Sequence, residues 1–124
     1  MKILYSMTEM TALDEYKMTQ GNSNKKLKDH LAGQTVTLEN CVIFEDERAD
    51  KETGEVKTTR VAVIKVNGEY YGTNSPSFVR ELYGMITHFE SKGLRVTKIK
   101  VRTGSTSRGT FIGAEPVEDG LLPM

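Results

Sequence analysis

Lys98, Lys100 and Arg102 stand two residues apart in the stretch LRVTKIKVRTGSTSRGTFIG, residues 94–113. Residues two apart in a β-strand project from one face, so this spacing predicts a row of three cations. The apolar residues between them then face the core. Lys and Arg side chains form charge-assisted hydrogen bonds with phosphate and carboxylate oxygens. The row therefore predicts a surface that binds an anionic partner.

The distribution of charge along the chain leaves two interpretations open. The 124 residues carry 17 Lys and Arg against 17 Asp and Glu, and a net charge of zero argues against generic nucleic-acid binding. However, residues 93–112 hold five cations and no acid, residues 35–55 hold seven acids and two cations, and residues 113–124 hold three acids. Either these blocks pair with each other or are solvated faces, or the basic block binds an external anion.

Further cations are expected near the row. Arg108 follows it across a polar turn, and the strand expected over residues 56–66 adds Arg60 and Lys65. An ordinary amphipathic strand with a soluble basic face explains these cations as well, so the aromatic residues have to decide.

Aromatic side chains favour a nucleic-acid ligand, because nonspecific single-strand binders combine a cationic groove with aromatic rings on which bases stack. Tyr70 and Tyr71 are adjacent in an expected strand, so they face opposite ways. Glu69 is charged and belongs outside, which predicts an exposed Tyr71 and a core Tyr70. The predicted contact residues are Tyr71, Tyr70, Lys98, Lys100, Arg102, Arg108, Arg60, Lys65 and Phe111.

The sequence does not favour an enzyme. Cys41 lies in the middle of an expected strand, where cysteine is usually a small core residue, so a nucleophilic Cys41 is a weaker alternative. His30 and His88 lack neighbouring ligands at metal-site spacing, and no phosphate-binding loop is present. We therefore expect neither a metal nor a cofactor.

Five short strands are expected to carry these residues. Alternating β-branched segments and turn residues delimit them. Gly54 and the pair Asn67–Gly68 mark the two hairpin turns. The strands are predicted over residues 35–45, 56–66, 70–74, 94–104 and 109–115.

One helix is expected between the third and fourth strands. Ser75 suits its N-cap, Pro76 its first turn and Gly93 its end. Three strands, a helix and two strands is the order of the five-stranded Greek-key barrel called the OB-fold. The fold class predicted is mainly β, an OB-fold-like barrel with a partly helical N-terminal extension.

Three segments are expected along the chain: an N-terminal extension and linker over 1–34, the barrel over 35–114, and a short acidic tail over 115–124. The first ten residues are too weakly apolar for a signal peptide, and no segment is long enough to span a membrane. A single cysteine suits a reducing cytosol.

The stretch ENCVIFEDERADKETGEVKTTRVAVIKVNGEYYGTNSPSFVRELYGMI, followed by IKVRTGSTSRGTFI, resembles the single-stranded DNA-binding proteins of Bacillus-type phages that replicate linear genomes by protein priming. The resemblance lies in the acidic hairpin, the NSPSF start of the helix and the closing TGSTSRGTFI. It spans roughly residues 20–114.

This resemblance implies an OB-type fold that binds single-stranded DNA without sequence preference and protects displaced strands. It also implies a phage DNA polymerase as the protein partner, and the host cytoplasm as the location. Tyrosines make contacts in that family, so Tyr70 and Tyr71 are candidates by position. The alternative is a protein–protein module whose basic row docks an acidic partner. The sequence does not fix an oligomeric state.

The acidic tail is expected to be a frayed terminus. Bacterial single-strand binders recruit partners through acidic tails, and this tail is similar in kind but much shorter. Deleting residues 117–124 is therefore expected to leave DNA affinity unchanged or slightly raised.

Overall fold

The computed structural model describes residues 2–19 and 24–124, except for the side chain of Arg48. The protein is mainly β with three α-helices, so the predicted class is confirmed. The elements are β1 Lys2–Ser6, α1 Ala12–Thr19, β2 Lys25–Lys26, α2 Leu27–Leu31, β3 Thr35–Thr37, β4 Asn40–Ala49, β5 Val56–Val66, β6 Glu69–Thr73, α3 Pro76–Ser91, β7 Leu94–Val96, β8 Lys98–Thr106, β9 Gly109–Pro116, a 3-10 turn Glu118–Gly120 and β10 Leu121–Pro123.

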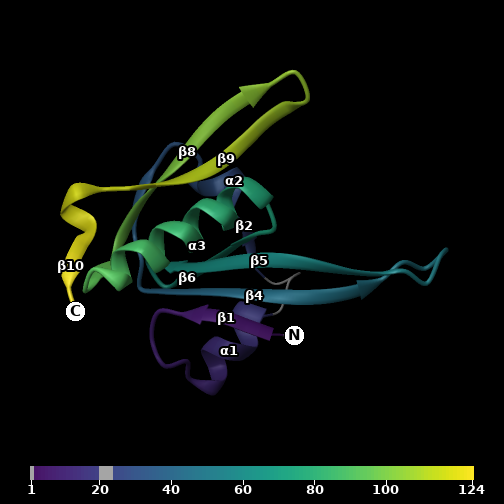
Figure 1. Ribbon diagram of the computed structural model, residues 1–124, viewed down its shortest axis with the longest axis horizontal. Coiled ribbons are helices and arrows are strands. Elements are labelled where there is room, and N and C mark those ends of the chain that lie inside the picture. Colours follow the sequence, from purple (N-terminus) through teal and green to yellow (C-terminus); the bar gives the residue numbers. More distant parts are fainter. Residues whose placement is uncertain (1, 20–23) are drawn as a thin grey trace.

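The strands form three open sheets (Figure 1). Their orders are β1-β4-β5-β6-β2, β3-β8-β9 and β10-β7. Two long hairpins, β4–β5 and β8–β9, extend beyond the body on the same side of the molecule (Figure 1). Over the described residues these sheets do not close into the barrel that the strand order predicted.

Two of the expected strands are each divided between sheets. The first splits into β3, which pairs with β8, and β4, which pairs with β5. The fourth splits at Thr97 into β7 and β8. The two breaks meet, because the Leu38 amide donates to the Thr97 carbonyl at 2.8 Å. A chain that turns from one sheet to the next keeps its β-type pattern, so the sequence does not reveal the break.

The predicted turns and helix are present. Asn67 and Gly68 have φ of 51° and 77°, the paired positive values of a type I′ hairpin turn. Helix α3 begins after Ser75, although the Ser75 hydroxyl makes no capping hydrogen bond, and Gly93 follows its end with φ of 77°. Strand β5 covers residues 56–66 as predicted.

The main core lies between α3 and the sheets. Phe78 and Leu82 of α3 are fully buried with Ile64 of β5 and Ile99 of β8. Burial of these apolar side chains is the main source of the folding free energy. The main core thereby holds the two hairpins together on one body.

A second, smaller apolar cluster lies on the other face of the five-stranded sheet. Met18 of α1 packs there on Val42, Phe44 and Val63, all of them buried. Figure 1 shows α1 on the side of β4 that lies away from α3. Helix α1 thus covers part of a sheet face that would otherwise be exposed.

Both chain ends contain strands that the sequence did not indicate. Strand β1 adds to the edge of the five-stranded sheet by pairing with β4. Strand β10 pairs with β7, and Gly120 before it is buried. The expectation of a frayed C-terminus is therefore wrong. Segments of three to five residues are too short to show a hydrophobic period, which explains the omission.

Deleting residues 117–124 is now expected to destabilise the fold by about 2–4 kcal/mol, the net value of several backbone hydrogen bonds. The deletion removes β10 and the Gly120 carbonyl that accepts from the Thr97 amide at 2.7 Å. Urea denaturation measures the loss. Asp119→Asn is the control, since it removes only the exposed ion pair with Lys98. An unchanged midpoint for the truncated chain would contradict a role for β10 in the fold.

Candidate nucleic-acid interface

The basic row on β8 has the predicted register. Ile99 and Val101 are fully buried, and Lys100 between them is exposed. Within the part of the chain that the structure describes, Lys100 forms no ion pair. Lys100 is therefore the cation of the row that remains available to an external anion.

The other two cations of the row have partners from distant parts of the chain. Lys98 lies 3.0 Å from Asp119, and Arg102 contacts both carboxylate oxygens of Glu81 at 2.6 and 2.7 Å. A third carboxylate, that of Glu115, lies 3.4 Å from Arg102 Nε. For Lys98 and Arg102 the charged blocks therefore pair with each other, because α3 and the C-terminal segment bring acids to them.

The candidate cations of β5 are paired as well. Arg60 lies 3.2 Å from Glu45 across the β4–β5 hairpin. Lys65 Nζ lies 3.6 Å from Asp14 of α1, whose charge raises the lysine pKa. Pairing between the charged blocks, the first of the two interpretations, thus describes much of the basic surface. Arg108 is exposed in the turn of the β8–β9 hairpin.

Phe111 has a fixed position on the β8–β9 hairpin. Its ring covers Gly104 on the neighbouring strand, where an added Cβ would come within 2.2 Å of a ring carbon. The Arg102 guanidinium carbon lies 5.6 Å from the ring centroid, within cation–π range. Phe111 remains half-exposed. A glycine beneath the ring and an anchored arginine beside it hold an aromatic surface on which a base can stack.

Tyr71 is not the exposed tyrosine. It is 9% exposed and belongs to the main core. Its hydroxyl donates to Glu69 Oε2 at 2.8 Å, and Lys25 Nζ contacts the same oxygen at 2.8 Å. These two donors hold the pKa of Glu69 below its usual value. The inference from Glu69 fails because, at the start of β6, its carboxylate reaches the surface although Tyr71 on the same face is buried.

Tyr70 is the half-exposed tyrosine, so its assignment to the core is wrong. It lies on the face of β6 opposite Tyr71, and its hydroxyl donates to Asp14 Oδ1 at 2.5 Å. This hydrogen bond raises the pKa of Tyr70. The Nζ atoms of Lys65 and Lys17 lie 5.4 and 5.7 Å from the ring centroid. Tyr70 thus has the cationic surroundings expected of a stacking residue, under α1.

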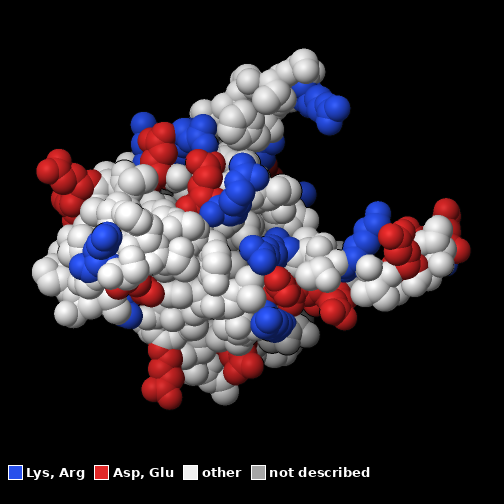
Figure 2. Space-filling model, in the orientation of Figure 1, with Lys and Arg blue, Asp and Glu red and all other residues white. Residues whose placement is uncertain are grey.

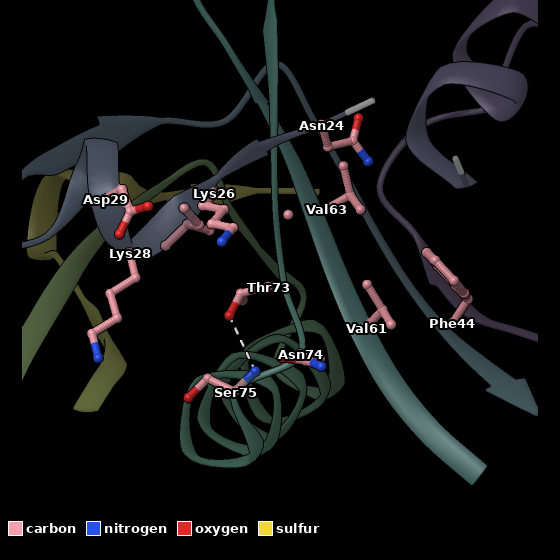
Figure 3. A pocket seen from close by; sticks show the side chains of 12 residues that line it. Asn24, Lys26, Lys28, Asp29, Phe44, Val61, Val63, Thr73, Asn74 and Ser75 are labelled. Carbon is pink, nitrogen blue, oxygen red and sulfur yellow. Dashed lines mark hydrogen bonds between the residues drawn. The ribbon is translucent and has the colours of Figure 1, made fainter. Parts of the chain in front are cut away.

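A hollow of about 530 Å³ opens beside this face (Figure 3). Its floor is the apolar sheet surface of Phe44, Val61 and Val63. Its rim is polar and is formed by Asn24, Lys26, Lys28, Asp29, Thr73, Asn74 and Ser75, with Leu27 and Gly72 completing the lining. In Figure 3 the rim comes from β2 and α2 on one side and from the β6–α3 junction on the other.

A second hollow of about 610 Å³ shares Asn74 with the first and is lined by two cations, Arg60 and Arg80. Among the described residues, Lys26, Lys28 and Arg80 form no ion pair. Figure 2 shows Lys and Arg side chains around the open space between the two hairpins. The cations and amides at the rim can contact phosphates, and Val61, the half-buried residue of the floor, offers an apolar contact to a base.

Sequence reasoning missed Lys26, Lys28 and Arg80. For the two lysines the signal was present in NKKLKDHL, residues 24–31, but this segment was assigned to an extension rather than to the sheet. Arg80 lies on α3, outside this segment. Strand β2 pairs with β6 in parallel, and the Lys28 ammonium donates to the Thr110 carbonyl of β9 at 2.9 Å. The segment therefore bridges the two sheets and brings its lysines to the hollow.

The alternative nucleophile, Cys41, is completely buried. Burial raises the pKa of its thiol to about 12, so the reactive thiolate is essentially unpopulated at neutral pH. In the described residues, no three His, Cys, Asp or Glu side chains gather as metal ligands, and no helix is long and apolar enough to cross a membrane.

Comparison with family models, with curated proteins and with solved structures finds no match to this chain.

Proposed function

We propose that the chain is a sequence-nonspecific single-stranded DNA-binding protein built on an open variant of the OB-fold. The observation that carries the proposal is the first hollow, where Lys26 and Lys28, which form no ion pair with the residues that the structure describes, border an apolar strip of β4 and β5. Such a surface neutralises phosphates and covers bases without reading their edges, which suits binding without sequence preference.

The strand pairing supports the OB-type assignment. Strands β4, β5 and β6 form a meander, β8 pairs with β9, and β3 pairs with β8. These are the pairings of a five-stranded barrel whose first strand bends between two sheets. The barrel stays open because β6 pairs with β2 instead of β9. OB-folds bind oligonucleotides on strands two and three and on the loops of the first and last hairpins. The equivalent elements here are β5, β6 and the two long hairpins. Of these, β5 and β6 line the first hollow, and β5 also lines the second.

The biological role that we propose is to coat and protect strands displaced during phage DNA replication in the host cytoplasm, in support of a phage DNA polymerase. No catalysis, metal or cofactor is part of this proposal. The acids at the outer part of the β4–β5 hairpin would repel DNA from that end and direct the strand toward the basic side (Figure 2). Docking of an acidic protein on the β8 row is less well supported, because two cations of that row are already paired.

Titration with oligo(dT), followed by tyrosine fluorescence, tests the proposal; the chain has five tyrosines and no tryptophan. If three to five phosphates are neutralised, log K should fall with log salt at a slope of roughly −2 to −3.5. A Lys26→Ala, Lys28→Ala double variant should bind more weakly, with the slope reduced by about 1.4. Lys92→Ala, at the far end of α3, is the matched control. A flat salt response, or equal losses in both variants, would contradict this binding surface.

A further inference from the structure

Three polar residues form a row across the sheet beside the first hollow. Asn40 of β4 is paired in register with Lys65 of β5, and Lys65 with Tyr70 of β6. Lys65 lies two residues from Val63, so the row continues along the face that forms the hollow floor. An aromatic ring beside a lysine, next to a DNA-binding hollow, is chemically suited to one more nucleotide.

Helix α1 occupies this row. The Asp14 carboxylate accepts a hydrogen bond from the Tyr70 hydroxyl at 2.5 Å and lies 3.6 Å from Lys65 Nζ. The Asp14 carboxylate therefore occupies a position in which a backbone phosphate could accept from the Tyr70 hydroxyl and contact Lys65 Nζ. On the strand next to Lys65, Asn40 is 2% exposed, and its Nδ2 donor has no hydrogen-bond partner among the described residues.

The attachment of α1 to the sheet is small. Of its eight residues only Met18 is buried, whereas Leu13 and Tyr16 are 60% and 65% exposed. An eight-residue helix is not stable alone in water, so α1 persists through its contacts with the sheet. Those contacts are chiefly Met18 on the apolar cluster and Asp14 on Tyr70 and Lys65.

We propose that α1 is a displaceable cover over the Asn40–Lys65–Tyr70 row, and that single-stranded DNA competes with Asp14 for it. The proposal rests on the proposed function and adds regulation of the same site. In the covered state the row is closed, so the apparent affinity equals the intrinsic affinity multiplied by the fraction of molecules in which α1 is displaced. When a strand enters, a phosphate replaces the Asp14 carboxylate, Tyr70 becomes free to stack, and α1 leaves the sheet.

Two variants with the same change in charge test the cover. Asp14→Asn weakens the contact with Lys65 and Tyr70, whereas Glu15→Gln alters an exposed neighbour on the same helix. Asp14→Asn should bind oligo(dT) about 5-fold more tightly than Glu15→Gln at equal salt, at the lower end of typical coupling between sites. A second readout is amide hydrogen exchange with and without oligo(dT). Exchange in residues 12–19 should accelerate on binding, while that in residues 76–91 should not.

The outcomes separate the two proposals. If oligo(dT) binds but residues 12–19 keep their protection and the two variants have equal affinity, the cover is refuted and DNA binding stands. If neither wild type nor Asp14→Asn binds oligo(dT), the proposed function fails and the cover fails with it. Binding by Asp14→Asn in the absence of wild-type binding would support both proposals.

Discussion

Val101→Asp is expected to destabilise the protein by about 3–5 kcal/mol, the usual consequence of a buried charge without a partner. Val101 is fully buried in β8, opposite Ala114 of β9, within the main core. A carboxylate there loses its hydration, and the main core, as far as the structure describes it, contains no Lys or Arg that could pair with it. Urea denaturation at pH 7 measures the loss.

The destabilisation caused by Val101→Asp should depend on pH in a characteristic direction. Burial in an apolar site raises the pKa of a carboxyl in the folded state above its value of about 3.9 in the unfolded chain. The unfolded state therefore ionises more readily, and the destabilisation grows as the pH rises through the unfolded pKa. The loss at pH 4 should be smaller than the loss at pH 7.

Thr103→Asp is the control, because Thr103 lies two residues further on the same strand face but is exposed. It should change stability by less than about 0.5 kcal/mol. Lys100→Ala should also leave the fold intact. If Val101→Asp folds normally and Lys100→Ala unfolds, the register of β8 is shifted by one residue.

Tyr71→Ala is the second large effect, with an expected loss of about 3–5 kcal/mol, as for other large core aromatics. The Tyr71 ring belongs to the main core and lies 5.9 Å from the His30 ring, so its removal opens a cavity between β6 and α2. Thermal or urea denaturation measures it. This reverses the expectation from the sequence, in which Tyr71 was the exposed residue.

Tyr71→Phe is the matched control, since it keeps the ring and removes only the hydrogen bond to Glu69. Its cost should be about 0.5–1.5 kcal/mol, the net value of one hydrogen bond. Tyr70→Ala should cost less stability than Tyr71→Ala, because the Tyr70 ring is half-exposed. Wild-type stability in Tyr71→Ala would place that ring outside the core.

If the proposed function is right, the two tyrosines exchange the roles that strand alternation first suggested. Tyr70, with Lys65 and Lys17 beside its ring, becomes the stacking candidate on the sheet, and Phe111 the candidate on the β8–β9 hairpin. Alternation correctly indicated that the two tyrosines face opposite ways. The choice of face required knowing that the Glu69 carboxylate could reach Lys25 from the core side of β6.

The sequence alone determined those features of the fold that depend on residues close to one another along the chain. The alternation of Val56–Val66 and of Ile99 and Val101 set two strands and their buried faces. The Asn67–Gly68 pair set a hairpin turn, since both positions need positive φ. These features depend on side chains within a few residues of one another, so they can be predicted from the sequence without knowledge of the tertiary contacts.

Tertiary structure decided which charges are free and how the sheets end. Lys98, Arg102 and Lys65 stand unpaired in sequence, yet each meets an acid 21 or more residues away when α1, α3 and the C-terminal segment pack. The described sheets do not close into a barrel, and two residues of β2 take the edge of β6. Such pairings depend on which surfaces come together on folding, and the hydrophobic periodicity of the sequence does not indicate them. The hollow with Lys26 and Lys28 exists for the same reason, since it is assembled from β2, α2, β4, β5, β6 and the two residues between β6 and α3.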